Sequence, residues 1–156
     1  MSDVTLELVD PGSEPARRAV AAYLRELDER FEEGFDASEA DGDEEKFSGD
    51  KGRFLVALRD GDVVVGCGGL TTLDDGVAEI KRMWVAQEAR GQGLAGRIRR
   101  RLEEWAVELG HDVVRLDTNR ALTNAIEMYR AAGYVDIERY NDNPYADFWF
   151  EKRLTS

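Results

Sequence analysis

The chain has 156 residues and a formal net charge of -12 at pH 7. This length suits one domain with a sizeable core, and a hydrophobic content of 42% is that of an ordinary globular protein, which excludes a disordered chain. The excess of acids argues against nucleic acid or an anionic membrane as a partner. We therefore expect a single domain over residues 1–156.

The sequence shows neither a membrane-spanning nor a secretory pattern. No apolar run approaches the length of a membrane span, and the first residues lack the basic and apolar regions of a secretory signal. The single cysteine excludes an internal disulfide. Together these features favour a cytoplasmic location.

The first predicted elements are a strand and an amphipathic helix. Residues 4–9 alternate weakly between apolar and polar types, which predicts a strand. A helix is expected from about Glu14, with Ser13 as its N-cap and Gly34 as its end. The following stretch, 36–45, has six acids in ten residues, which predicts a solvated segment.

Three strands are then expected to form an antiparallel meander, over residues 53–59, 62–73 and from 77 onward. Asp60-Gly61 and Asp75-Gly76 are the hairpin turn signals between them. Cys67, in the middle strand, could be an acyl-carrying nucleophile or a small buried residue. The sequence around it offers no histidine or basic activator, which favours the buried role.

The stretch 77–109 predicts a strand, a tight glycine turn and a long helix from about Gly93 to Glu108. The turn also contains Gly91 and Gly96, and a turn without side chains lets a bulky anion approach the backbone. The first N–H groups of a helix have no partner within it, and the helix dipole favours negative charge at this end. The turn is therefore a predicted site for a phosphate-bearing ligand.

The same glycines also match the GxGxxG fingerprint of dinucleotide-binding folds, and Asp117 lies about twenty residues further on, as that fingerprint requires. Three features argue against this interpretation. Four residues separate the preceding strand from Gly91, that strand carries three charged side chains, and only 60 residues follow Gly96. The turn is not a Walker loop either, because no Gly-Lys-Ser/Thr follows it.

The helix after the turn carries a cluster of arginines in its first half. Positive charge is unfavourable near a helix N-terminus, so the cluster suggests a compensating anion. A solvated helix face is an equal alternative for two of them, Arg99 and Arg100. The cluster consists of Arg97, Arg99, Arg100 and Arg101.

The remaining predicted elements are a strand over 112–118, a helix over about 122–132 and strands over 134–139 and 146–153. The helix-linked crossover into the strand at 112–118 implies parallel pairing with the strand that begins at 77. We therefore predict an α/β (α+β) fold, with a mixed, strongly twisted sheet of about seven strands and helices on both faces. His111, the only histidine, cannot build a zinc site or a triad with the one cysteine in another segment, so no metal is expected.

Three motifs resemble the GNAT superfamily of acyl-CoA-dependent N-acyltransferases. The pattern Arg90-x-x-Gly93-x-Ala95 is similar to the pyrophosphate motif of that family. The strand EIKRMWV before it and the run NAIEMYRAAGY at 124–134 are similar to two further family segments. The resemblance covers roughly residues 53–153 and implies a sheet whose fourth and fifth strands splay apart around acetyl-CoA, the acyl donor.

The resemblance also assigns residues to this donor. It implies that the backbone of the fourth strand pairs with the pantetheine amides and that the glycine turn holds the pyrophosphate. Asn119 and Asn124 are expected to contact the donor, or alternatively to serve in capping and turns; Leu122 stands where the family often has an asparagine. The full set is Met83, Trp84, Val85, Arg90, Gly91, Gln92, Gly93, Leu94, Ala95, Gly96, Asn119 and Asn124.

Two residues are expected to take part in the chemistry. Glu79 stands where several family members have a general base, or it pairs with a neighbouring cation in the sheet. Strict alternation along the strand places its side chain on the face of Met83 and Val85. Tyr129 matches the family tyrosine that points at the cofactor sulfur and can donate a proton to it, although its spacing alone predicts core packing.

The resemblance predicts an acetyl-CoA-dependent N-acetyltransferase that acts on a small-molecule amine or an amino terminus. The alternative is a catalytically silent acyl-CoA-binding or regulatory domain. The sequence leaves open the acceptor, the acyl-chain length and the oligomeric state, a homodimer included.

Two segments bear on the acceptor. The acids at 36–45 could attract a cationic acceptor, or the overall acidity could reflect adaptation to high salt. The run 140–146 could shape the acceptor pocket, or it could be a plain loop. The candidate pocket residues in that run are Tyr140, Asn141, Asn143 and Tyr145.

Overall fold

The computed structural model describes residues 3–31, 34–35 and 44–154, and its strands form one seven-stranded sheet in the order β1-β2-β3-β4-β5-β7-β6. The strands are β1 (Val4–Leu8), β2 (Arg53–Arg59), β3 (Val63–Asp74), β4 (Val77–Val85), β5 (Val113–Thr118), β6 (Val135–Asp136) and β7 (Phe148–Arg153). The helices are α1 (Glu14–Arg30), α2 (Leu94–Glu108) and α3 (Thr123–Ala131), with 3-10 turns η2 (Glu44–Phe47) and η3 (Gln87–Ala89). The predicted fold class, a mixed sheet with helices, is confirmed.

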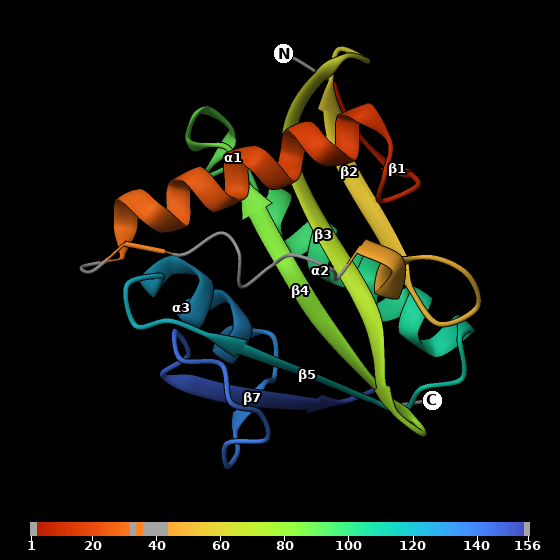
Figure 1. Cartoon of the computed structure of the whole chain (residues 1–156), viewed down its shortest axis with the longest axis vertical. Coiled ribbons are helices and arrows are strands. Elements are labelled where there is room, and N and C mark those ends of the chain that lie inside the picture. Colours follow the sequence, from red (N-terminus) through yellow and green to blue (C-terminus); the bar gives the residue numbers. More distant parts are fainter. Residues whose placement is uncertain (1–2, 32–33, 36–43, 155–156) are drawn as a thin grey trace.

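The helices cover both faces of the sheet, as Figure 1 shows. On the face of α2 and α3, Ile98 and Ile126 pack in the larger core cluster with strand residues such as Leu116. On the face of α1, Ala19 packs in a second cluster with Phe54. No helix within the described ranges is both long and apolar enough to cross a membrane.

The first four strands form the predicted antiparallel meander. Its tight turns lie where the sequence places them, with φ angles of 54° at Asp60, 86° at Gly61 and 73° at Gly76. These left-handed conformations suit glycine and tolerate aspartate, which is why the Asp-Gly pairs mark the turns.

The pairing of β4 with β5 is parallel and short. Only three residue pairs are formed, the last between Glu79 and Arg115, although β4 continues to Val85 and β5 to Thr118. Beyond Glu79 the two strands separate, and Figure 1 shows them diverging. The predicted splay of strands four and five is confirmed, and it leaves the end of β4 without a neighbour on one side.

One residue of β4 adopts a conformation that the sequence pattern does not reveal. Arg82 has a φ of 57°, and the ladder to β3 slips there, since Lys81 lies opposite Gly69 but Trp84 lies opposite Cys67. The extra residue is a β-bulge, which reverses the alternation of side chains beyond it. Left-handed φ in a residue other than glycine costs about 1 kcal/mol, so the surrounding packing holds this bulge.

The bulge corrects the predicted face of Glu79. Trp84 packs with the α1-side cluster, whereas the Met83 sulfur lies near Gly68 together with Ile98 of α2. Glu79 lies two residues before Lys81 on the unbroken part of the strand, and so shares the α1 face with Trp84. The prediction that it shares the face of Met83 and Val85 is wrong, because strict alternation does not continue through Arg82.

Several predicted boundaries also move. The first helix ends at Arg30, not at Gly34, and the Ser13 side chain does not cap it, because its hydroxyl donates to the Asp10 carbonyl at 2.6 Å. β6 has two residues instead of six, since this edge strand pairs only with β7 before the chain leaves the sheet. β7 begins at Phe148. Most of the predicted acidic segment, residues 36–43, lies outside the described residues.

Candidate active site

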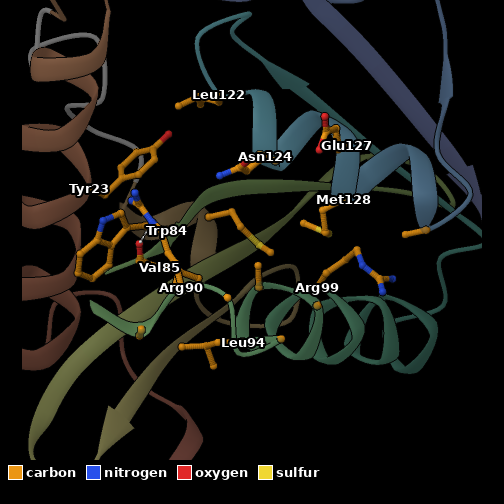
Figure 2. A pocket seen from close by; sticks show the side chains of 18 of the residues that line it. Tyr23, Trp84, Val85, Arg90, Leu94, Arg99, Leu122, Asn124, Glu127 and Met128 are labelled. Carbon is orange, nitrogen blue, oxygen red and sulfur yellow. Dashed lines mark hydrogen bonds between the residues drawn. The ribbon is translucent and has the colours of Figure 1, made fainter. Parts of the chain in front are cut away.

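A cavity of about 780 Å³ opens beside the end of β4, where that strand has left β5. Figure 2 shows α3 on one side of it, presenting Asn124 and Met128, and α2 on the other, presenting Leu94 and Arg99. Of the residues predicted to hold the acyl donor, those that line this cavity are Met83, Trp84, Val85, Arg90, Gly91, Gly93, Leu94, Ala95, Gly96 and Asn124. Gln92 and Asn119 do not line it.

The glycine turn leaves both space and free donors at the start of α2. The first helical bond runs from the Arg97 N–H to the Gly93 carbonyl at 3.1 Å, so the three preceding N–H groups have no acceptor within the helix. A Cβ atom added to Gly91 or Gly93 would meet no other atom within 4 Å. Both glycines have φ near 78°, a conformation that glycine adopts freely. The turn can therefore receive a phosphate against its backbone, and a pyrophosphate-bearing ligand fits it.

The arginine cluster divides between the cavity and the surface. Arg99 and Arg100 line the cavity, and Arg99 is buried with its Nη1 3.0 Å from both carboxylate oxygens of Glu103. Arg97 donates instead to the Val4 carbonyl, and Arg101 pairs with a glutamate on its own helix. Burial excludes a merely solvated role for Arg99.

A contact from α1 holds the first arginine of the motif. The Arg90 Nη2 donates to the Glu26 carboxylate at 2.6 Å, and its Nε donates to the Val85 carbonyl at 3.0 Å. Glu26 also pairs with Arg30, which donates to the Ala121 carbonyl in the turn between β5 and α3. Helix α1 is thereby tied to both sides of the gap between the splayed strands.

A second cavity, of about 360 Å³, adjoins the first. Five residues line both cavities, namely Tyr23, Leu27, Met83, Leu122 and Ala125. The shared wall belongs to α1, β4 and the start of α3. A ligand in one cavity would therefore lie next to a ligand in the other, where β4 and β5 splay apart. The arrangement can hold two molecules at the same time.

The loop before β7 contributes to this second cavity, which is one of the two roles that the sequence offered for the run 140–146. Asn141, Asn143 and Tyr145 line it, and so does Asn119. The Asn119 amide donates to the Tyr145 carbonyl at 2.7 Å and its Oδ1 accepts from the Ala121 N–H at 2.8 Å. Asn119 therefore has the turn role that the sequence offered as the alternative to a donor contact, and it lies beside the second cavity.

Glu79 is buried and lines neither of the two cavities. The Tyr140 hydroxyl donates to its Oε2 at 2.7 Å. Burial raises the pKa of Glu79, while the bond from Tyr140 and the nearby Lys81 oppose this rise. A carboxyl with a raised pKa is a better base than an ordinary one, but a proton must reach Glu79 through an intervening group such as water.

Tyr129 belongs to the core and to the second cavity together. It is 4% exposed, and its ring lies 5.3 Å from the ring of Tyr134 and 6.4 Å from that of Phe150. It also lines the second cavity. Burial raises the pKa of its phenol, so the hydroxyl keeps its proton at neutral pH and can donate it. Core packing and a role at the site do not exclude each other here.

Cys67 and His111 line neither of the two cavities, and each contacts other groups of the protein. The buried Cys67 thiol donates to the Arg82 carbonyl at 3.1 Å, and burial raises the pKa of the thiol to about 12. It therefore stays protonated, as the predicted buried role requires. His111 lies 3.0 Å from the Thr72 hydroxyl, and burial lowers its pKa.

The structure brings further residues to the site. Phe31 and Phe35 reach the second cavity from the end of α1, and Asp117 reaches it from β5. The sequence marks neither as a site residue, because Phe31 falls within the predicted amphipathic helix and Asp117 stands only where a dinucleotide fingerprint would place an acid. The alternation along β5 indicates that Asp117 is set apart from the core, since Arg115 and Asp117 are half-buried and alternate with buried residues.

The comparisons with known proteins agree with this geometry. Residues 20–134 match the profile of the family described as Acetyltransferase (GNAT) family. A protein named IAA acetyltransferase from Azospirillum brasilense is 39% identical over 85 residues, which cover 54% of this chain and 55% of that protein. The chain thus spans about half the length of the curated relatives it matches.

Solved structures share the fold over nearly the whole chain. An acetyltransferase of the GNAT family from Staphylococcus aureus Mu50 superposes with a TM-score of 0.85 at 15% identity, covering 98% of this chain and all of that one. A GNAT family acetyltransferase from Elizabethkingia anophelis with acetyl-CoA bound gives a TM-score of 0.62 at 15% identity, covering 97% and 98%. With the family profile matched over most of its length, the chain belongs to the GNAT acetyltransferase family.

Proposed function

We propose that this protein is an acetyl-CoA-dependent N-acetyltransferase that transfers the acetyl group directly to a primary amine of a small molecule or an amino terminus. The observation that supports this most is the pair of adjoining cavities, one at the glycine turn and one beside Tyr129. A relative in fold is described with acetyl-CoA bound, and a relative in sequence is named an acetyltransferase.

The acyl donor supplies an acetyl thioester, which an amine converts to an amide while the thiol is released. In this proposal the N–H groups at the start of α2 bind the pyrophosphate, and Arg99 and Arg100 face the donor's phosphates. The free backbone of β4 after Glu79 can pair with the pantetheine amides.

The protein's own groups then move two protons. Glu79 takes one proton from the ammonium of the acceptor through a water molecule, because its side chain does not reach the cavities. Tyr129 donates its phenolic proton to the departing sulfur as the C–S bond breaks, and it regains a proton through solvent as the nitrogen loses its second proton to form the amide. The overall reaction releases one proton, since an ammonium and a thioester become an amide and a thiol.

A catalytically silent acyl-CoA-binding domain is the second candidate, and the position of Glu79 outside both cavities is the observation that favours it. A thiol-release assay with acetyl-CoA across amines, amino acids and peptides tests both candidates. Turnover with an amine, together with the acetylated product by mass spectrometry, supports the transferase. Binding of acetyl-CoA by calorimetry without release in any of these mixtures supports the silent domain.

A further inference from the structure

The second cavity contains a carboxylate and an aromatic wall that neither the family motifs nor the proposed chemistry uses. We propose that this cavity takes a cationic amine attached to an aromatic or similarly flat apolar group, with the ammonium at Asp117 and the flat group against Phe31, Phe35 and Tyr145. This inference rests on the proposed function, because it specifies the acceptor of the same site.

Two asparagines of the loop before β7 hold the Asp117 carboxylate in place as a receiver for a cation. The Asn141 side-chain amide donates to its Oδ2 at 2.6 Å, and the Asn143 amide donates to its Oδ1 at 3.1 Å. These donors are neutral, so they fix the direction of the carboxylate without cancelling its charge. Each carboxylate oxygen keeps a further acceptor site, and an ammonium can use it.

The two asparagines are themselves fixed by further bonds. The Asn141 Oδ1 accepts from the Trp149 indole at 3.0 Å, and the Asn143 Oδ1 accepts from the Tyr145 N–H at 3.0 Å. These acceptor bonds leave the NH₂ group of each amide to face Asp117. The carboxylate is therefore positioned before any ligand arrives, which lowers the cost of binding a charged group.

The aromatic wall is built from two distant segments. The ring of Phe35 lies 5.9 Å from that of Phe31 and 4.5 Å from that of Tyr145, and the Phe31 and Tyr145 rings are 5.8 Å apart. All three line the second cavity. Such a wall offers ring faces to a flat group and attracts a nearby cation.

The other charges of the cavity do not reverse this preference. Lys81, Arg82 and Asp142 also line it. Lys81 and Arg82 each already interact with another group of the protein, and Asp142 adds a second negative charge. The Arg82 guanidinium also lies over the Phe47 ring, 5.0 Å from its centre. The Asp117 carboxylate would repel an anionic acceptor, whereas it would form an ion pair with a cationic one.

The position of Asp117 also suits transfer. It lies on β5 beyond Arg115, the last residue paired with β4, and hence in the splayed part of the strand. Tyr129 lines the same cavity, and the wall shared with the donor cavity includes Met83. A nitrogen bound at Asp117 would thus share one cavity with Tyr129 and with Met83 of the wall that adjoins the donor cavity.

The test measures binding and transfer separately, with coenzyme A present for the binding arm. The probes are 2-phenylethylamine, the uncharged 2-phenylethanol and the small cation ethylamine. We expect the wild type to bind 2-phenylethylamine at least about tenfold more tightly than either of the others, since a charge-assisted bond and ring contact both contribute. Equal affinity for the amine and the alcohol would overturn the role of Asp117.

Three variants assign the effect to residues. Asp117→Asn should weaken 2-phenylethylamine about tenfold or more and leave 2-phenylethanol unchanged, as circular dichroism confirms folding. Glu138→Gln removes the same charge from an exposed carboxylate that lines neither cavity and should change amine affinity less than about twofold. Equal losses in the two variants would show a general field and refute the assignment. Phe35→Leu should weaken 2-phenylethylamine more than ethylamine, and equal losses would refute the aromatic wall.

Failure of the proposed function has a different signature. If no amine releases thiol but 2-phenylethylamine still binds in a manner that requires Asp117, the cavity assignment holds and the transferase does not. If thiol release occurs with amines but shows the same kcat/KM for ethylamine and 2-phenylethylamine, the transferase holds and the assignment of the acceptor class fails.

Discussion

Burial governs the protonation of the side chains beside the two cavities. It raises the pKa of Glu79, of Tyr129 and of Tyr140, so each of them favours its neutral form more than it would in water. For a base this is an advantage, because a proton taken from an ammonium is held more firmly. For an acid such as Tyr129 the raised pKa means that the proton is present throughout the neutral range.

Replacing Tyr129 by phenylalanine separates its two roles. The ring contacts with Tyr134 and Phe150 remain, so the Tm should change little, while the proton donor is lost. If the phenol assists the departing sulfur, kcat should fall about 10²-fold with acetyl-CoA affinity unchanged. Steady-state kinetics and calorimetry measure the two quantities. Full activity in Tyr129→Phe would leave this residue with a packing role alone.

Glu79→Gln tests the base through its pH dependence. With a raised pKa, the wild-type kcat/KM should fall as the pH drops through a value above the ordinary 4.5 of glutamate, and the glutamine variant should lack this limb. The variant's loss should be largest above that pKa, where the wild-type carboxylate is ionised. Matching profiles in wild type and variant would remove Glu79 from the mechanism.

The raised pKa of Glu79 also predicts how the stability of the protein changes with pH. A carboxyl whose folded-state pKa is raised contributes stability below its unfolded pKa, and this contribution is lost as the pH rises through the folded pKa. The free energy of unfolding of the wild type, measured relative to Glu79→Gln, should therefore increase as the pH falls from about 8 to about 4.5. Urea titrations measure it, with the exposed Glu138→Gln as a control that should show no such trend.

Among the elements, those with a local cause were the predictable ones. The Asp-Gly turns and the glycine turn before α2 follow from backbone preferences, and helices α2 and α3 follow from apolar periodicity. The bulge at Arg82 was not predictable, because it depends on how β4 pairs with β3 and packs under α1. The sheet face of Glu79 was not predictable for the same reason, because the bulge reverses the alternation of side chains.

The site was predictable only in the parts that one segment builds. The turn at 90–96 contains its own donors and its own space, so its residues line the first cavity as expected, Gln92 excepted. The second cavity joins the end of α1, β5 and the loop before β7. Asp117 and Phe35 meet there through tertiary contacts, which no spacing in the sequence encodes.

The glycine turn gives a test at the level of one element. Asn and Asp both tolerate the left-handed conformation of Gly93 and both cap helices, so Gly93→Asn and Gly93→Asp differ mainly in charge. Acetyl-CoA at about a hundredfold excess over Kd should raise the wild-type Tm by about 5 °C or more. The shift should be reduced in Gly93→Asn and abolished in Gly93→Asp. Equal Tm shifts in all three proteins would show that the phosphates of acetyl-CoA do not bind at this turn.

At the scale of the whole molecule, the two cavities lie side by side and share Met83 and Ala125, so donor and acceptor should bind together. Initial rates with both substrates varied should give intersecting lines, the pattern of a ternary complex. Cys67→Ala should keep the wild-type kcat within about threefold, because the buried thiol stays protonated. Parallel lines, or an acetylated Cys67 trapped without amine, would overturn direct transfer.

The net charge of -12 acts on the molecule as a whole. Like charges repel one another in the compact state, and raising the salt from about 0.1 M to about 1 M shortens the screening length from about 10 Å to about 3 Å. We therefore expect potassium chloride over this range to raise the Tm by about 3 °C or more, or about 1 kcal/mol of stability. Scanning calorimetry measures this, and chloride is preferred because sulfate also acts by exclusion from the surface.

A matched variant shows whether net charge is the cause. Glu88, Glu108 and Glu138 are exposed, and changing all three to glutamine reduces the charge from -12 to -9. The variant should be more stable at low salt and should respond less to salt, because less repulsion remains to be screened. The same salt response in both proteins would show that the acidity does not limit stability. In that case, two results together would assign the acidity to attraction of the acceptor. The kcat/KM for a cationic amine would fall as the salt rises, while the inhibition constant of the uncharged 2-phenylethanol would stay the same.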